Sequence, residues 1–180
     1  MSEPIHDVLI IALALVTSTV GSLGGLGGAI LLVPLLTFGD MTISQAAPLG
    51  LVSVIAGSVA AGRMQSQDGA VNHRFGVVTG LAGVGGGFLK TPLSSELMRL
   101  PAKVAAATST FTIGLTASTA LLLMALDGRV VASDAALVVL GSLLGGTMGS
   151  QMQRHLSPPV VRRTTSVVLV VIAVVMVVRA

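Results

Sequence analysis

The sequence is dominated by long stretches that contain no charged side chain. Residues 8–39, 41–62, 104–126 and 135–153 include no Asp, Glu, Lys or Arg. A helix needs about 20 apolar residues to cross the hydrocarbon core of a bilayer, and each run is close to or above that length. Only 9% of all residues are charged, whereas a soluble domain of ordinary composition carries about a quarter. The chain is therefore expected to lie in a membrane.

Two shorter apolar runs, residues 75–89 and 164–178, bring the number of hydrophobic segments to six. They can still span because flanking arginines extend toward the membrane surface. The apolar runs are continuous and do not alternate with polar residues, which is typical of membrane helices and not of a membrane β-barrel. We predict an all-α, multi-pass protein of the cell membrane with about six transmembrane helices.

The chain also repeats itself. The run GLGGAILLVP at residues 25–34 aligns with GVGGGFLKTP at residues 83–92, and residues 47–58 align with residues 107–118. Each copy reads as a glycine-broken segment, a short loop and a helix rich in small residues. The second copy continues into two more helices, whereas the first copy does not. We predict one membrane domain made of an incomplete tandem repeat: a first repeat at 1–62, a polar loop at 63–75 and a second repeat at 76–180.

These residues, above all the run GVGGGFLKTPLSSELMRLPAKVAAATSTFTIGLTAS of the second copy, resemble the TauE/SafE family of sulfite and organosulfonate exporters. The resemblance implies a duplicated four-helix unit in which each half opens with a glycine-rich segment that ends in proline. Typical members have about eight helices. Here the last two helices of the first unit are missing, with the join near residues 77–80.

The glycine clusters are the predicted functional feature. One straight helix over residues 8–39 would run about 48 Å, against a hydrocarbon core of about 30 Å. Glycines and prolines are unfavourable inside helices, so each cluster predicts a break. Helices broken at corresponding places in two repeats indicate a transporter binding site, because a half-helix points its positive N-terminal end at the gap. Close packing through G-x-x-x-G spacing is the alternative, and we favour it for the ladder Gly141, Gly145 and Gly149.

Lys90 and a row of hydroxyls are the side chains suited to hold an anion. Lys90 follows the second cluster, where it either faces the gap or extends to the membrane surface beside Glu96. The hydroxyls either contact a ligand or bond back to their own helix. The predicted substrate-binding residues are Gly25, Gly27, Gly28, Gly85, Gly86, Gly87, Lys90, Thr108, Ser109 and Thr112. The predicted helix-breaking residues are Pro34, Pro92 and Pro101.

The sequence lacks the residues that other classes of function require. There is no cysteine, the three histidines lie in tails or loops without metal-ligand spacing, and no nucleophile–base pair lies within a span. We therefore predict no enzyme, no metal and no cofactor. The net charge of +3 is assigned to membrane orientation and not to nucleic-acid binding. Basic loops at 99–103 and 154–163 favour one orientation, while Arg63, Arg74 and Arg129 favour the opposite one.

Two functions remain open. The first is a transporter that moves a small anion by alternating access around the two broken helices; the resemblance makes that anion sulfite or an organosulfonate. The second is a shortened, non-transporting membrane protein or assembly subunit that forms homo-oligomers through its small-residue helix faces. The predicted partners are a small anionic solute and the lipid bilayer, with a second copy of the chain left open in both cases, and no nucleic acid is predicted to bind.

Overall fold

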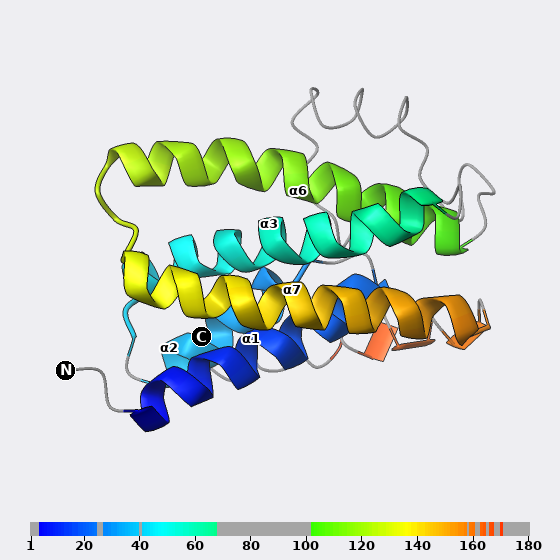
Figure 1. Cartoon of the computed structure of the whole chain (residues 1–180), viewed down its shortest axis with the longest axis horizontal. Helices are drawn as coiled ribbons and strands as arrows, with labels where there is room; N and C mark the ends of the chain where they lie inside the picture. The colour runs from blue at the N-terminus through cyan, green and yellow to red at the C-terminus, as the bar shows by residue number, and fades with distance from the viewer. Residues whose placement is uncertain are drawn as a thin grey trace.

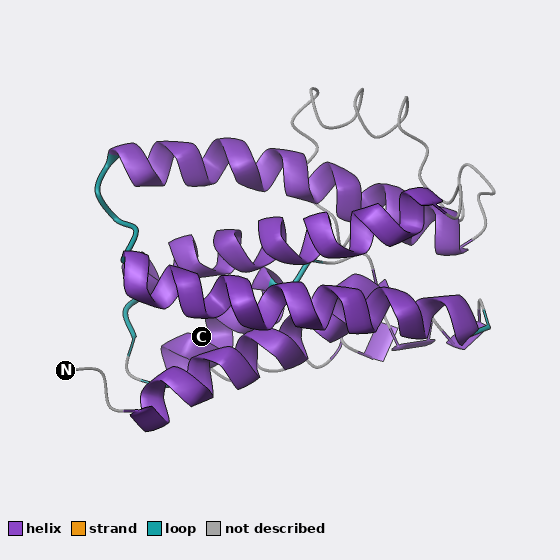
Figure 2. Cartoon of the chain, viewed as in Figure 1, coloured by secondary structure: helices purple, strands orange, loops and turns teal. Residues whose placement is uncertain are grey.

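Five helices make up the described part of the computed structural model, which covers residues 4–24, 27–39, 41–67 and 102–157 and isolated positions between 159 and 170 (Figure 1). They are α1 (Pro4–Gly24), α2 (Ala29–Phe38), α3 (Ile43–Gln67), α6 (Ala102–Leu126) and α7 (Ala132–His155). These described residues contain helices and loops and no strand (Figure 2).

Four of these helices are long and apolar enough to cross a membrane: α1, α3, α6 and α7. They match the predicted segments 8–39, 41–62, 104–126 and 135–153, with α3 continuing five residues beyond Gly62 to Gln67. The short α2 is apolar but has only 10 residues. The predicted segment 164–178 lies largely outside the described residues, and 75–89 lies wholly outside them. The structure therefore shows a multi-pass helical protein with four described spans.

The first glycine cluster reverses the chain. The helix ends at Gly24 and restarts at Ala29, so the predicted break is confirmed. Gly27 has φ +73°, a left-handed conformation that glycine adopts without strain. A Cβ placed on Gly21 would lie 2.7 Å from the backbone of both Gly27 and Gly28, so the returning chain lies directly against α1. The half-helix α2 thus runs back beside α1 instead of continuing it.

The side chains of α2 confirm this antiparallel course. Leu32 and Leu36 are buried in one apolar cluster with Ile10 and Ala14 of α1. Pro34 was predicted to break the helix, and that prediction is wrong, because Pro34 lies inside α2 and the helix continues to Phe38. Proline has φ near −65°, which suits a helix, whereas the reversal needs the positive φ of Gly27.

Helices α1 and α7 pack in parallel along the glycine ladder. A Cβ added at Gly141, Gly145 or Gly149 would run into the carbonyl oxygens of Ile11, Leu15 and Thr19, respectively. The two series keep the same spacing of four residues, so one face of α7 follows one face of α1 for more than two turns. The packing role predicted for this ladder is confirmed. Its lack of side chains allows the two backbones to approach closely.

The next face of α7 holds α3. Gly146 of α7 lies against Gly57 of α3, where an added Cβ would be 2.6 Å from the Gly57 carbonyl oxygen. The Ser142 hydroxyl donates to Ser53 Oγ at 2.8 Å, and residues farther along both helices also pair, so α3 and α7 are parallel. Helix α6 runs in the opposite direction on the other side of α3 (Figure 1). Helix α3 is therefore the centre of the bundle.

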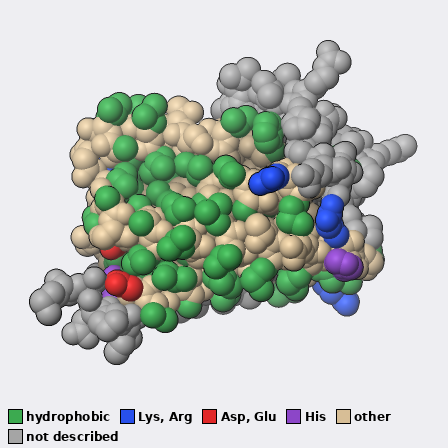
Figure 3. All heavy atoms as spheres, viewed as in Figure 1, with side chains coloured by type: hydrophobic (Ala, Val, Ile, Leu, Met, Phe, Trp, Pro, Cys, Tyr) green, Lys and Arg blue, Asp and Glu red, His purple; other side chains and the backbone are tan. Residues whose placement is uncertain are grey.

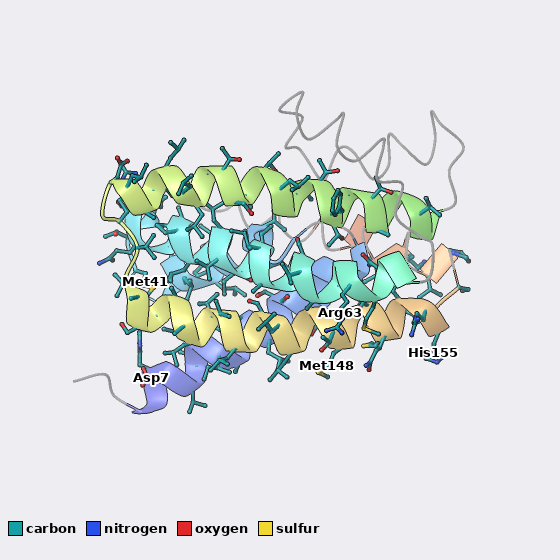
Figure 4. The ribbon with its side chains drawn as sticks, turned by 45° about the horizontal axis from the view of Figure 1, so that its top comes forward. Asp7, Met41, Arg63, Met148 and His155 are labelled. Carbon is teal, nitrogen blue, oxygen red and sulfur yellow. The ribbon has the colours of Figure 1, made fainter. Side chains whose placement is uncertain are left out.

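Charges separate to the two ends of the bundle. Asp7, Asp134 and the pair Asp127–Arg129 lie at the end where α1 and α7 begin. Arg154 and His155 lie in the last turn of α7 at the other end, and Arg63 lies toward it in α3 (Figure 4). Apolar side chains cover much of the face in between (Figure 3). The Arg129–Asp127 pair is 51% and 63% exposed, which agrees with the solvated loop expected there.

This arrangement corrects one assumption of the sequence analysis. Arg63 and Arg154 had been assigned to opposite sides of the membrane, because residues 8–39 were treated as a single passage. The return of the chain through α2 adds a reversal, so α3 ends on the same side as α7. The hydrogen bond between Gln65 and Gln153, at 2.8 Å, joins these two helix ends directly.

Candidate functional site

The N-terminus of α2 lies inside the bundle, about halfway along the helices that surround it. Its N-cap, Gly28, lies against Ser18 of α1 and Ser53 of α3: an added Cβ would be 3.2 Å from Ser18 Cα and 2.7 Å from Ser53 Oγ. Ser53 is the eleventh of the 25 residues of α3. In a bilayer this position corresponds to the middle of the membrane.

The first turn of α2 has no side-chain cap. Gly28 carries no side chain, and its carbonyl accepts the first helical bonds, from Leu31 N at 3.3 Å and Leu32 N at 3.0 Å. The N–H groups that begin a helix have no carbonyl partner within it, and the helix dipole makes this end electropositive. The arrangement can therefore stabilise a negatively charged group without a nearby lysine or arginine.

Three buried serines stand beside this helix end, one from each parallel helix. Ser18, Ser53 and Ser142 are 1%, 0% and 0% exposed. The Ser18 hydroxyl donates to the Ser142 carbonyl at 2.9 Å, and the Ser142 hydroxyl donates to Ser53 Oγ at 2.8 Å. Because Ser53 accepts the bond from Ser142, its own hydroxyl proton stays available to donate to another group. Ser18 and Ser142 were not predicted from the sequence, although Ser142 directly follows Gly141 of the ladder.

The predicted hydroxyl row on α6 is buried. Thr108, Ser109 and Thr112 are between 0% and 2% exposed. Thr112 Oγ1 donates to the Thr108 carbonyl at 2.9 Å, and Thr116 and Ser118 bond back to their own helix in the same way. For Thr112, Thr116 and Ser118 the structure therefore shows the alternative in which a hydroxyl bonds back to its own helix. The ligand contacts of Thr108, Ser109 and Thr112 stay predictions.

The side chain of Ile113 in α6 reaches Gly27 of the first glycine cluster. A Cβ on Gly27 would lie 3.1 Å from Val54 and 3.3 Å from Ile113, so apolar side chains of α3 and α6 close this side of the turn. Ile113 directly follows Thr112 in the chain. The other predicted residues lie outside the described residues: Gly25, Gly85, Gly86, Gly87, Lys90, Pro92 and Pro101. Their roles stay predictions, and α6 begins immediately after Pro101.

A chain of two buried amides closes the far end of α1. Gln153 Nε2 donates to the Leu23 carbonyl at 2.9 Å, and Gln65 Nε2 donates to Gln153 Oε1 at 2.8 Å. The Leu23 carbonyl can only accept, so it fixes the orientation of both amides in turn. Gly149 lies against the Thr19 carbonyl, and Gln153 and Leu23 each come four residues later in α7 and α1. The Gln153–Leu23 bond therefore continues the register of the glycine ladder. It also satisfies a carbonyl in the last turn of α1, where no helical donor is available.

Comparison with known proteins identifies the family. The sequence model described as "Sulfite exporter TauE/SafE" matches residues 73–176, which is more than half of the chain. The chain belongs to the TauE/SafE family. The match includes the second glycine cluster, α6 and α7, and the described helices α1, α2 and α3 lie before it.

A curated relative agrees with the family assignment. The chain is 34% identical over 92 residues to a Bacillus subtilis (strain 168) protein named "Probable membrane transporter protein YunE". The alignment covers 51% of this chain and 34% of the relative, so the chain matches about a third of that protein's length. No solved structure matches significantly. Family and spans together identify a multi-pass protein of the cell membrane.

Proposed function

We propose that this TauE/SafE protein is a membrane transporter for a small anion of the sulfite or organosulfonate class. The family description and the name of the curated relative support a transporter and, for the family, sulfite. The observation that carries the proposal is the N-terminus of α2, which lies uncapped at mid-depth among buried hydroxyls. Such an end supplies N–H donors and positive potential where an anion would otherwise be strongly disfavoured.

The proposed binding groups come from two sources. From the described residues they are the α2 N-terminus at Gly27 and Gly28 and the hydroxyl of Ser53. From the second repeat they are Lys90 and the glycines at 85–87, which follow the same sequence pattern as the first cluster. Two half-helix ends that face one anion would bind it without an intramembrane carboxylate or metal.

Movement is proposed to follow from the packing around α2. Helices α1, α3 and α7 are joined by backbone contacts at glycines and by the Ser18–Ser142–Ser53 bonds, so they act as one rigid body. Helix α6 packs on α3, where Ile113 and Ala117 share an apolar cluster with Val54 that also contacts Ala29 at the start of α2. Apolar contacts are not directional, so we propose that α6 moves relative to the rigid body and opens the site to alternate sides.

The test is anion flux into proteoliposomes that contain the purified protein. The unaltered chain is expected to give saturable uptake of sulfite or a small organosulfonate. Ser53→Ala should raise the half-saturating concentration roughly tenfold or more, because a hydrogen bond to a charged group contributes about 1.5–3 kcal/mol. Lys90→Ala should weaken flux as well. Ser133→Ala is the matched control, since Ser133 is exposed and donates to its neighbour Asp134 at 3.1 Å.

The possible results distinguish an error in the proposed binding groups from an error in the proposed function. If flux is saturable but unchanged in Ser53→Ala and Lys90→Ala, the protein is a transporter and the proposed binding groups are wrong. If folded protein gives no flux with any oxyanion, the transporter proposal fails. The non-transporting alternative then stands, with the family membership as ancestry.

A further inference from the structure

A groove of about 370 Å³ lies between α3 and α6. Its lining is mostly apolar, with Ile55 and Val59 from α3 and Phe111 and Leu115 from α6. Val59 and Leu115 are also exposed, at 63% and 44%, so this surface is open and not part of the packed core. In a membrane-spanning bundle such a surface faces hydrocarbon chains.

Two polar side chains of α3 interrupt this apolar lining. Arg63 is exposed at the groove and lies four residues before the end of α3, toward the basic end of the bundle that His155 marks in Figure 4. No carboxylate in the described part of the chain forms an ion pair with Arg63. A 25-residue helix runs about 37 Å, so Arg63 stands near the edge of a hydrocarbon core about 30 Å thick.

Ser58 lies deeper in the same groove. It is 8% exposed, and its Oγ has no hydrogen-bond partner among the described residues. It stands five residues before Arg63, which places it about 7.5 Å farther from the membrane surface. A buried hydroxyl without a partner is unfavourable, so this position favours an occupant that accepts a hydrogen bond.

We propose that this groove binds one anionic phospholipid. The order of groups along α3 matches the order of groups in such a lipid. Arg63 meets the phosphate at the headgroup level, Ser58 donates to an ester carbonyl below it, and the acyl chain continues past Ile55 of α3 and Leu115 of α6. Arginine binds phosphate oxygens through paired N–H donors. Arg154, which is also exposed and lies in the last turn of α7, adds positive charge at this end of the bundle.

The source of the lipid follows from the membrane orientation. Loops rich in Lys and Arg stay on the cytoplasmic side. The basic end of the bundle therefore faces the cytoplasm, where the leaflet surface is negative in lipids such as phosphatidylglycerol. A zwitterionic lipid offers the same phosphate, ester and chain, but its ammonium group opposes Arg63. The site should therefore prefer a lipid with net negative charge.

The experiment measures lipid binding to the purified full chain by native mass spectrometry, with phosphatidylglycerol and phosphatidylcholine of the same acyl chains. One arginine near a membrane surface favours an anionic headgroup roughly fivefold. We expect that preference in the unaltered protein and its loss in Arg63→Gln. Ser58→Ala should weaken both lipids and leave the preference unchanged, because the ester carbonyl is common to both. Arg129→Gln is the control, since Arg129 lies at the opposite end beside Asp127.

Three results would overturn the proposal. The first is equal binding of the two lipids by the unaltered protein. The second is a loss of preference in Arg129→Gln as large as that in Arg63→Gln. The third is displacement of the lipid by millimolar inorganic phosphate, which would make the groove a site for soluble anions. A melting temperature unchanged in all three variants shows that each comparison is made on folded protein.

Discussion

The glycine ladder of α7 gives a sharp prediction about stability. Substituting Gly145→Ala places a Cβ against the Leu15 carbonyl oxygen, 3.0 Å from Ser18 Cβ and 3.1 Å from the Leu15 carbonyl carbon. None of these is the far end of a flexible side chain, so α1 and α7 must move apart. Overpacking of this kind costs about 1–3 kcal/mol. The alanine recovers about 1 kcal/mol through its higher helix propensity, so the net loss is up to about 2 kcal/mol.

The matched control is Gly62→Ala. Gly62 is also in a helix, α3, but an added Cβ there meets nothing within 4 Å. This variant should be neutral or more stable by up to about 1 kcal/mol. Thermal unfolding of both variants in the same detergent makes the comparison. A Gly145→Ala protein that melts as high as Gly62→Ala would refute the close backbone packing of α1 and α7.

Three further predictions concern the amides, the turn and the orientation. Gln153→Leu should lower the free energy of unfolding by about 1–3 kcal/mol, because it leaves the Leu23 carbonyl and the Gln65 amide without their partners. Adding Gln65→Leu should recover part of that loss, which a double-mutant cycle measured by thermal unfolding tests. Gly27→Ala should destabilise more than Gly128→Ala in the same assay, because both glycines have positive φ but only Gly27 has side chains within 4 Å. The chain has no cysteines, so single cysteines can report the orientation. A cysteine at position 128 should react with an impermeant reagent added outside the cell, and one at position 155 should not. The opposite pattern would show that the basic end faces outward.

The sequence predicted most of the helices because a membrane helix depends on length and apolar character alone. The uncharged runs at 104–126 and 135–153 lie within α6 and α7, and the packing role of Gly141, Gly145 and Gly149 is confirmed. The break after Gly24 was also predicted, since no straight helix fits residues 8–39 in a bilayer. These features follow from local composition and spacing.

The direction of α2 could not be predicted in the same way. Whether a helix continues or turns back after a glycine cluster depends on one positive φ at Gly27 and on the contact between Gly21 and Gly28. Neither the φ of Gly27 nor the contact between Gly21 and Gly28 can be inferred from the hydropathy of the sequence. The reversal changed the side assigned to Arg63, and it brought Ser18 and Ser142 to the candidate site from separate helices. The Gln65–Gln153 bond likewise depends on a parallel register between α3 and α7 that only the packed bundle fixes.

The central claim is that the buried end of α2 is an anion site that opens to water during transport, and Ser53 offers the most direct measurement. Ser53 is 0% exposed. The account predicts that Ser53→Cys, in this chain without native cysteines, reacts slowly with a charged thiol reagent and that ethanesulfonate slows the reaction further. Ser133→Cys should react quickly with or without it. A thiol at position 53 that never reacts, or that reacts at the same rate with the sulfonate present, would contradict the account.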